Sequence, residues 1–139
     1  MKLLVCGGMG FIGGTFVRNH QDKNPNDHIT NVDSLTTGSN IKNLENIDKT
    51  NYQFIQDDIK NAEVIDKLAS DVDLIVNFAA ETHVDRSISN SKQFLETNIL
   101  GTHSLLEAAK KHEKLFIHIS TDELYGDAEN QESFTEKSL

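Results

Sequence analysis

The sequence has one cysteine, one proline, no tryptophan and no long uninterrupted apolar run. The single cysteine, Cys6, excludes an intramolecular disulfide and suits a reducing compartment, and its place in the first apolar run favours a buried packing role. No apolar stretch approaches the roughly 18 residues that a membrane-spanning helix needs. The first residues also lack the small-residue cleavage site of a signal peptide. We therefore expect a cytoplasmic protein with no membrane partner.

Positive charge is also scarce: 13 lysines and arginines stand against 22 aspartates and glutamates, which gives a formal net charge of -9. Nucleic acids are therefore poor candidates as partners, because their phosphates repel an acidic surface. The six histidines are scattered and show no metal-ligand spacing, so no metal site is predicted. With 139 residues, of which 37% are hydrophobic, the chain has the size and composition of one domain over 1–139.

The sequence does contain a regular alternation of apolar runs and helix-period segments. Five runs have the length and composition of strands: 2–6, 28–33, 52–56, 73–80 and 115–120. Helical periodicity separates most of them, at 11–20, 62–70 and 91–112. The last of these segments is expected to bury a stripe made of Phe94, Leu95, Ile99, Leu105, Leu106 and Ala109. The alternation predicts a parallel sheet with helices on its faces.

The first apolar run is followed by the glycine-rich stretch GGMGFIGG, residues 7–14. Gly8, Gly10 and Gly13 fit the pattern G-x-G-x-x-G, while Gly7, Gly10 and Gly13 fit the variant G-x-x-G-x-x-G. Either pattern alone is weak evidence, but this stretch follows a predicted strand and opens a predicted helix. In that context the backbone can approach a pyrophosphate at the positive helix N-terminus. The stretch therefore predicts dinucleotide binding on a Rossmann-type α/β fold, a doubly wound parallel sheet of strand order 3-2-1-4-5.

Asp33 ends the second predicted strand, 20 residues after Gly13. An acid at this place in the fingerprint hydrogen-bonds the ribose hydroxyls of NAD, and its charge repels the 2′-phosphate of NADP. The residues that follow, SLTTGSN at 34–40, include no arginine that could accept that phosphate. We therefore predict NAD as the cofactor.

The stretch FIHISTDELYG, residues 116–126, places Thr121, Asp122 and Glu123 directly after the fifth apolar run. One interpretation is that the two acids only cap the following turn. The other is that they act together as a general acid and a general base, since two close carboxylates disfavour each other's ionisation. Successive residues of a strand point to opposite faces, so both acids can reach one ligand only if the strand ends by about Thr121.

Taken together, these motifs resemble those of extended short-chain dehydrogenases/reductases. They are, in order, GGMGFIGG (7–14), DDI (57–59), FAAETHVDRSI (78–88), TNILGTHSLLEAA (97–109) and STDELYG (120–126). Within that group the chain resembles the N-terminal part of dTDP-glucose 4,6-dehydratases. The motifs that best distinguish these enzymes from the rest of the group are AAETHVDRS and STDELYG. The group's 4-epimerases and decarboxylases usually carry serine pairs in place of Asp122 and Glu123, and its GDP-mannose dehydratases a serine and a glutamate.

The resemblance implies a lyase reaction on a nucleotide-sugar substrate. Hydride passes from C4 of the hexose to NAD, water leaves across C5 and C6, and hydride returns to C6, which yields a 4-keto-6-deoxy sugar nucleotide. By the same resemblance Asp122 is the acid that protonates the departing C6 hydroxyl, Glu123 is the base that removes the C5 proton, and Thr121 hydrogen-bonds the C4 oxygen. A homodimer is implied for the full-length enzyme.

The resemblance also assigns residues to the two ligands. The expected cofactor contacts are Gly7, Gly10, Phe11, Ile12 and Gly13 at the pyrophosphate, Asp33, Ser34 and Thr36 at the ribose, Asp58 and Ile59 at the adenine, Phe78, Ala79 and Ala80 at the cofactor's middle, and Thr97. Glu81 and Thr82 are candidates for contacts with sugar hydroxyls. For His83 a substrate contact and an ordinary loop histidine are equally supported. Asn98 is expected to brace the neighbouring loops.

The catalytic signature of the family, Tyr-x-x-x-Lys, is absent from this sequence: Gln56 stands four residues after Tyr52, and Glu129 four residues after Tyr125. In the family the motif lies shortly downstream of STDELYG. We therefore expect residues 1–139 to be an incomplete NAD-binding domain, without the C-terminal substrate-binding part and inactive by itself. Its last apolar run would form an exposed sheet edge, so we expect the isolated chain to be marginally stable and to self-associate.

Two alternatives stay open at the level of sequence. The chain could be a non-catalytic dinucleotide-binding module that keeps the fold without turnover. It could also belong to a UDP-sugar dehydratase or epimerase of the same family, because related UDP-glucose dehydratases share STDE. A glutamate rather than a glutamine at position 81 favours a dTDP-sugar over a UDP-sugar as the substrate.

Overall fold

The computed structural model describes residues 1–126 and 133–138. Its centre is one sheet of five parallel strands: β1 (Lys2–Cys6), β2 (His28–Val32), β3 (Tyr52–Ile55), β4 (Leu74–Asn77) and β5 (Leu115–His118). The strand order is β3-β2-β1-β4-β5, which confirms the predicted order of a doubly wound sheet. The last two strands end earlier than the apolar runs that predicted them, because the residues after Asn77 and His118 leave the sheet and form cavity walls.

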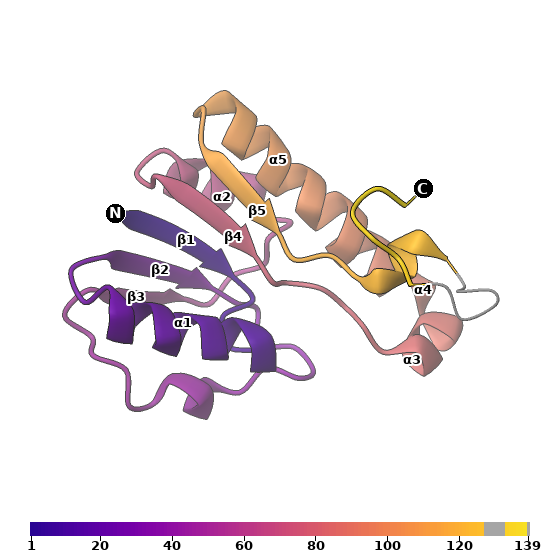
Figure 1. Ribbon diagram of the computed structural model, residues 1–139, viewed down its shortest axis with the longest axis horizontal. Helices are drawn as coiled ribbons and strands as arrows, with labels where there is room; N and C mark the ends of the chain where they lie inside the picture. Colours follow the sequence, from indigo (N-terminus) through magenta and orange to yellow (C-terminus); the bar gives the residue numbers. More distant parts are fainter. Residues whose placement is uncertain (127–132, 139) are drawn as a thin grey trace.

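The helices lie on both faces of this sheet (Figure 1). α1 (Phe11–Lys23) covers one face, and α2 (Ala62–Ala69) and α5 (Thr102–Lys111) cover the other. The remaining elements are short: η1 (Ile41–Leu44), α3 (Val84–Ser89), α4 (Ser91–Phe94), η2 (Leu95–Gly101) and η3 (Asp122–Tyr125). None of the helices in the described ranges is long and apolar enough to cross a membrane.

The core has two halves, one on each face of the sheet. Because side chains alternate along a strand, β1 directs Leu3 and Val5 toward α1, and Leu4 and Cys6 toward α2 and α5. Burial of Cys6 raises the pKa of its thiol to about 12, and the nearby charge of Asp33 acts in the same direction. Cys6 is therefore a packing residue, as its place in the sequence predicted.

The helical segment 91–112 differs from the regular α-helix that its periodicity predicted. α4 continues into η2, which is π-helical, and only then into α5. A π turn spans more residues than an α turn, so a stripe spaced at 3.6 residues does not stay on one face across η2. The buried members of the expected stripe are Leu105 and Ala109, and Phe94 is half-buried. The prediction is wrong for Leu95, Ile99 and Leu106, which are exposed by 54%, 58% and 46%. The π-helical stretch accounts for the first two, whereas Leu106 follows it in α5 and points about 100° away from the buried Leu105.

In the described part of the chain, β5 pairs with β4 alone and forms one edge of the sheet. Leu115, Ile117 and Ile119 are exposed there, as expected for an uncovered edge. Self-association of the isolated chain through this edge stays a prediction, which sedimentation velocity at several concentrations would check.

Candidate functional site

The loops that follow the carboxyl ends of β1, β2, β3 and β4 enclose a cavity of about 280 Å³, here called the first cavity. Doubly wound folds bind ligands at this end of the sheet, where the strand order reverses. All the predicted cofactor residues line it: Gly7, Gly10, Phe11, Ile12, Gly13, Asp33, Ser34, Thr36, Asp58, Ile59, Phe78, Ala79, Ala80 and Thr97. The wall also includes residues that the fingerprint did not indicate: Val32, Thr37, Gly38, Ser39 and Asp57.

The glycine loop between β1 and α1 is packed so tightly that a side chain at Gly7 or Gly13 would overlap backbone atoms. Gly7 has a φ of +78°, and a Cβ there would lie 2.6 Å from the amide nitrogen of Ala79. A Cβ on Gly13 would lie 2.3 Å from the carbonyl oxygen of Gly7. These contacts bring α1 close to the strand ends, and they favour the reading of the loop as G-x-x-G-x-x-G.

The N-terminus of α1 presents backbone donors to the first cavity. No hydrogen bond within residues 1–126 and 133–138 uses the amides of Phe11, Ile12 or Gly13, and the helix has neither a side-chain cap nor an acidic residue in its first turn. Unpaired amides together with the helix dipole create a site that favours an anion. The loop can therefore bind a phosphate group.

Asp33 occupies a buried position at the end of β2, with only 6% of its surface exposed. Its Oδ2 accepts a hydrogen bond from the amide of Met9 (2.9 Å), and its Oδ1 accepts from the Leu35 amide and the Ser39 hydroxyl (both 2.8 Å). A carboxylate offers about four acceptor positions, so Asp33 can hold the glycine loop and still accept one bond from a ligand hydroxyl.

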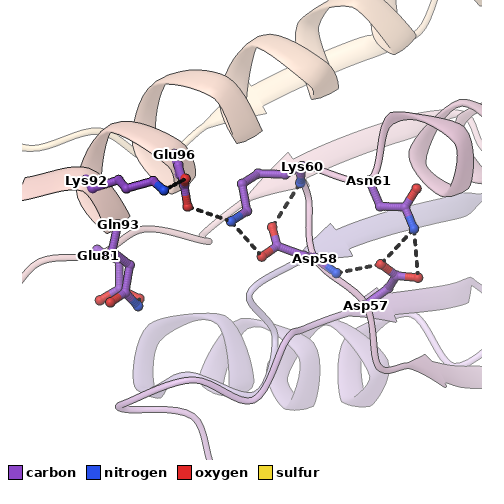
Figure 2. A network of polar contacts seen from close by, with 8 residues as sticks. All are labelled: Asp57, Asp58, Lys60, Asn61, Glu81, Lys92, Gln93 and Glu96. Atoms are coloured by element: carbon purple, nitrogen blue, oxygen red, sulfur yellow. Dashed lines mark hydrogen bonds and ion pairs between the residues drawn. The ribbon is translucent and has the colours of Figure 1, made fainter.

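The loop between β3 and α2 contributes Asp57, Asp58 and Ile59 to the wall of the first cavity. Ionic contacts connect this loop to the helical segment (Figure 2). Lys60 Nζ lies 3.2 Å from Glu96 Oε2 and 3.5 Å from Asp58 Oδ2. The hydrogen bond from Lys60 is the main cause that lowers the pKa of Glu96. Beside this contact Ile59 packs so closely on η2 that a Cβ on Gly101 would lie 2.5 Å from Ile59 Cδ1.

Breaking the Lys60 contact should loosen this wall. We expect Lys60→Met to weaken cofactor binding roughly two- to fivefold, the scale of a partly exposed ion pair. The difference should vanish in 1 M salt, where screening acts over about 3 Å. Because Lys60 lowers the pKa of Glu96, the contact persists at neutral pH and is lost as pH falls through that lowered pKa. Titration of the intact protein with NAD at low and high salt measures the effect.

Lys92→Met is the matched control. Lys92 pairs with the same carboxylate at 3.6 Å but comes from the same helical segment, four residues away, and is 83% exposed. Its loss removes the same charge without releasing the loop, so cofactor affinity should stay near the wild-type value. Equal effects of the two variants would show that net charge, and not the ion pair between Lys60 and Glu96, governs cofactor binding.

A second cavity, of about 430 Å³, adjoins the first. The two share a wall made of Ile12 and residues 78–82, which include the predicted substrate residues Glu81 and Thr82. Thr121 and Glu123 line the second cavity, whereas Asp122 and His83 are not part of its wall. The structure thus brings most of the predicted catalytic and substrate residues together beside the predicted cofactor residues.

Glu81 is buried at this shared wall and is held by the helical segment. The side-chain amide of Asn98 forms two hydrogen bonds with the backbone of Glu81. Glu81 N donates to Asn98 Oδ1 (2.8 Å), and Asn98 Nδ2 donates to Glu81 O (2.9 Å). Gln93 Nε2 donates to Glu81 Oε1 at 2.9 Å. Asn98 lies in η2, so the π-helical stretch positions the brace that was expected of it.

The acids after β5 lie on a short turn. The strand ends at His118, before Thr121, as required for both acids to face one ligand, and η3 begins at Asp122. Thr121 is the cap of η3: its Oγ1 accepts from the Glu123 amide at 3.3 Å and lies 3.3 Å from Asp122 Oδ1. In the described residues no backbone amide of the turn donates to the carboxylate of Asp122 or Glu123, so capping does not occupy these groups.

Across 1–126 and 133–138, no three His, Cys, Asp or Glu side chains gather as metal ligands would. The groups that line the two cavities and can act on a ligand include the amides of the glycine loop, the Thr121 hydroxyl, and the carboxylates of Asp33, Glu81 and Glu123.

Comparison with known proteins agrees with the resemblance drawn from the motifs. The chain is 41% identical over 140 residues to the dTDP-glucose 4,6-dehydratase of Mycobacterium tuberculosis, a match that covers 99% of this chain and 42% of that protein. It is 46% identical to the low-salt glycan biosynthesis protein Agl12 of Haloferax volcanii, over 91% of this chain and 41% of that protein. The chain thus spans about two fifths of the length of these relatives.

Solved structures share the fold as well. A crystal structure of DesIV, a dTDP-glucose 4,6-dehydratase from Streptomyces venezuelae with NAD bound, superposes with a TM-score of 0.91 at 42% identity, over 100% of this chain and 45% of that one. A UDP-glucose 4-epimerase from Stenotrophomonas maltophila gives a TM-score of 0.83 at 28% identity, over 94% and 40%. The family model described as GDP-mannose 4,6 dehydratase matches residues 4–139. The chain therefore belongs to the GDP-mannose 4,6-dehydratase family.

Proposed function

We propose that the intact protein is an NAD-dependent dTDP-glucose 4,6-dehydratase, which converts a dTDP-hexose to a 4-keto-6-deoxy sugar nucleotide. One observation carries this proposal: the cavity lined by the predicted cofactor residues shares a wall with the cavity lined by Thr121 and Glu123. The relatives and solved structures at 41–42% identity that are named dTDP-glucose 4,6-dehydratases support the choice of substrate. The paired acids Asp122 and Glu123 argue against an epimerase.

The first cavity fits a dinucleotide. Its unpaired amides at the start of α1 are suited to a pyrophosphate, and Asp33 keeps an acceptor position for a ribose hydroxyl. Asp33 is also the only charged side chain at the end of β2, and its charge disfavours a 2′-phosphate. NAD, when bound there, would supply the hydride acceptor and donor for the sugar.

The residues at 121–123 are assigned the elimination of water. Asp122 donates a proton to the departing C6 hydroxyl, Glu123 accepts the proton from C5, and Thr121 hydrogen-bonds the C4 oxygen. The two carboxylates are adjacent in sequence on η3, and within the described residues no backbone amide of the turn donates to them. Thr102 Oγ1 is a buried hydroxyl of the second cavity with no partner in the described residues, and it can bind a polar group of a ligand there.

Residues 1–139 alone contain no Tyr-x-x-x-Lys, so we propose that they bind the cofactor but do not turn over substrate by themselves. A cytoplasmic location for the enzyme is supported by the single cysteine among residues 1–139, which leaves this part of the chain without an internal disulfide, as is usual in a reducing compartment. The exposed apolar residues Leu95, Ile99 and Leu100 on the helical segment support a homodimer of the intact protein.

Cofactor preference tests the proposed site directly. We expect NAD to bind at least roughly tenfold more tightly than NADP, because the 2′-phosphate would meet the carboxylate of Asp33. Asp33→Ala should weaken NAD binding and reduce this preference. Calorimetric titration of the intact protein with each cofactor measures both quantities, and formation of the 4-keto-6-deoxy product from dTDP-glucose tests the activity.

Ser39→Ala separates the ribose contact from the internal role of Asp33. It removes one hydrogen bond that the carboxylate accepts but leaves the charge in place, so the preference for NAD should persist. Equal affinity of the wild-type protein for NAD and NADP would contradict the assignment of Asp33 to the ribose.

A further inference from the structure

A fully buried amide side chain lies directly beneath the glycine loop. Asn31 belongs to β2, which pairs with strands on both sides, and none of its surface is exposed. Strands covered on both faces usually carry apolar residues, and a buried amide is costly unless its hydrogen bonds are made. Asn31 is not part of the dinucleotide fingerprint, so its presence at this place needs a separate explanation.

The amide of Asn31 connects the loop to the neighbouring strand. Its Oδ1 accepts a hydrogen bond from the Gly8 amide at 3.0 Å, and its Nδ2 donates to the hydroxyl of Tyr52 on β3 at 2.9 Å. A backbone N–H can only donate, so the atom facing Gly8 must be the oxygen. The Tyr52 hydroxyl then fixes the amide in this orientation. Burial raises the pKa of Tyr52, so its hydroxyl stays protonated at neutral pH.

Asn31 and Asp33 act on adjacent residues of the loop. Asn31 lies on β2 and Asp33 directly follows the strand, two residues later, so that both side chains reach the glycine loop. Asn31 accepts a hydrogen bond from the amide of Gly8, and Asp33 accepts one from the amide of Met9. A Cβ on Gly8 would lie 2.3 Å from Asn31 Oδ1, so the side chain fills the space directly below the loop.

These contacts determine which amides remain for a ligand. The amides of Gly8 and Met9 are turned toward β2, and that of Gly10 donates to the Gly7 carbonyl at 3.2 Å. The next amides, those of Phe11, Ile12 and Gly13, have no partner within the described residues, and these three residues line the first cavity. We propose that Asn31, held by Tyr52, is a positioning residue that fixes the glycine loop for binding of a pyrophosphate. This inference rests on the proposed dinucleotide site.

The test uses Asn31→Leu, which keeps the volume and removes both hydrogen bonds, and Tyr52→Phe, which removes only the hydroxyl. In the intact protein, Asn31→Leu should weaken NAD binding roughly five- to hundredfold, the effect of leaving a buried donor unpaired. Tyr52→Phe should weaken it by a smaller factor. Affinity for adenosine, which has no phosphate, should change less than twofold in both variants. Calorimetry measures NAD binding, and ligand-observed NMR measures adenosine binding.

Thr30→Val is the matched control, because it removes a buried hydroxyl from the same strand without lining either cavity. It should bind both ligands as the wild type does. Wild-type affinity of the folded Tyr52→Phe and Asn31→Leu variants for NAD would overturn the positioning role. An equal loss of NAD and adenosine would overturn it too, since it would indicate general disruption. Failure of the wild-type protein to bind NAD would instead refute the proposed function on which the inference rests.

Discussion

Replacing Asp122 by Asn or Glu123 by Gln in the intact enzyme is expected to slow formation of the 4-keto-6-deoxy product by roughly two to four orders of magnitude, the usual effect of losing a general acid or base. NAD affinity should change little, because neither acid lines the first cavity. Both substitutions preserve side-chain size and hydrogen bonding, so η3 and its Thr121 cap should persist. Steady-state turnover together with NAD titration measures the two effects.

Asp85→Asn provides the control for this experiment. Asp85 is an exposed acid in the first turn of α3 and lines neither cavity, so its neutralisation should leave turnover unchanged. Near-normal product formation by both the Asp122 and the Glu123 variant would contradict the roles assigned to them. Loss of turnover with Glu123→Gln alone would assign the chemistry to the acid that lines the second cavity.

Gly10→Ala is expected to weaken NAD binding roughly tenfold to hundredfold. The protein itself can accommodate the added methyl group: φ of Gly10 is -75°, and its Cβ would meet only the Gly7 carbonyl oxygen, at 3.3 Å. The methyl group would project into the first cavity, where the backbone must approach the pyrophosphate closely, and overpacking of this kind costs about 1–3 kcal/mol. Titration with NAD and a thermal melt of the free protein separate binding from stability.

Gly14→Ala is the matched control for steric demand. Its Cβ would also lie 3.3 Å from a carbonyl oxygen, that of Gly8, but Gly14 does not line the first cavity. Because Gly14 lies inside α1, alanine there should also favour the helix by up to about 1 kcal/mol. A Cβ on Gly14 would also lie 3.4 Å from Asn43 Cβ, so this variant is a control for affinity: it should bind NAD as the wild type does. Similar losses of affinity in both variants would show that Gly10 is small for packing rather than for a ligand.

The fold and the first cavity were largely predictable from sequence because each rests on a local signal. Alternating apolar runs and helical segments predicted the strand positions. The spacing from the glycine loop to Asp33, together with the family motifs, predicted the residues that line the first cavity. The strand order followed from the fingerprint, since the glycine loop and the acid occur together in doubly wound folds. All of these features depend on residues close in sequence or on a recurrent motif.

The remaining features depend on contacts between distant residues. Nothing in the sequence near Asn31 indicates that its amide would lie beneath Gly8, because this contact exists only once β2 lies beside β1. The tie between Lys60 and Glu96 joins residues 36 apart in the chain. Even the contact of Ser39 with Asp33, six residues apart, depends on backbone geometry, because the chain turns at Gly38, whose φ is +92°. A periodicity count likewise has no means of detecting where a helix changes from α to π.

Segment length, and not only residue type, is constrained in η2. A π-helical stretch is geometrically an α-helix with an additional residue inserted, so removing one residue would return the segment to α geometry. Loss of Leu100, which is exposed, would let α4 and α5 keep their relative orientation but would change the angular positions of the residues inside η2. Asn98 lies inside η2, so its hydrogen bonds with the Glu81 backbone would be disturbed, although no contacting side chain had been replaced. Single-residue deletions in this helix should therefore be far less tolerated than substitutions of its exposed side chains.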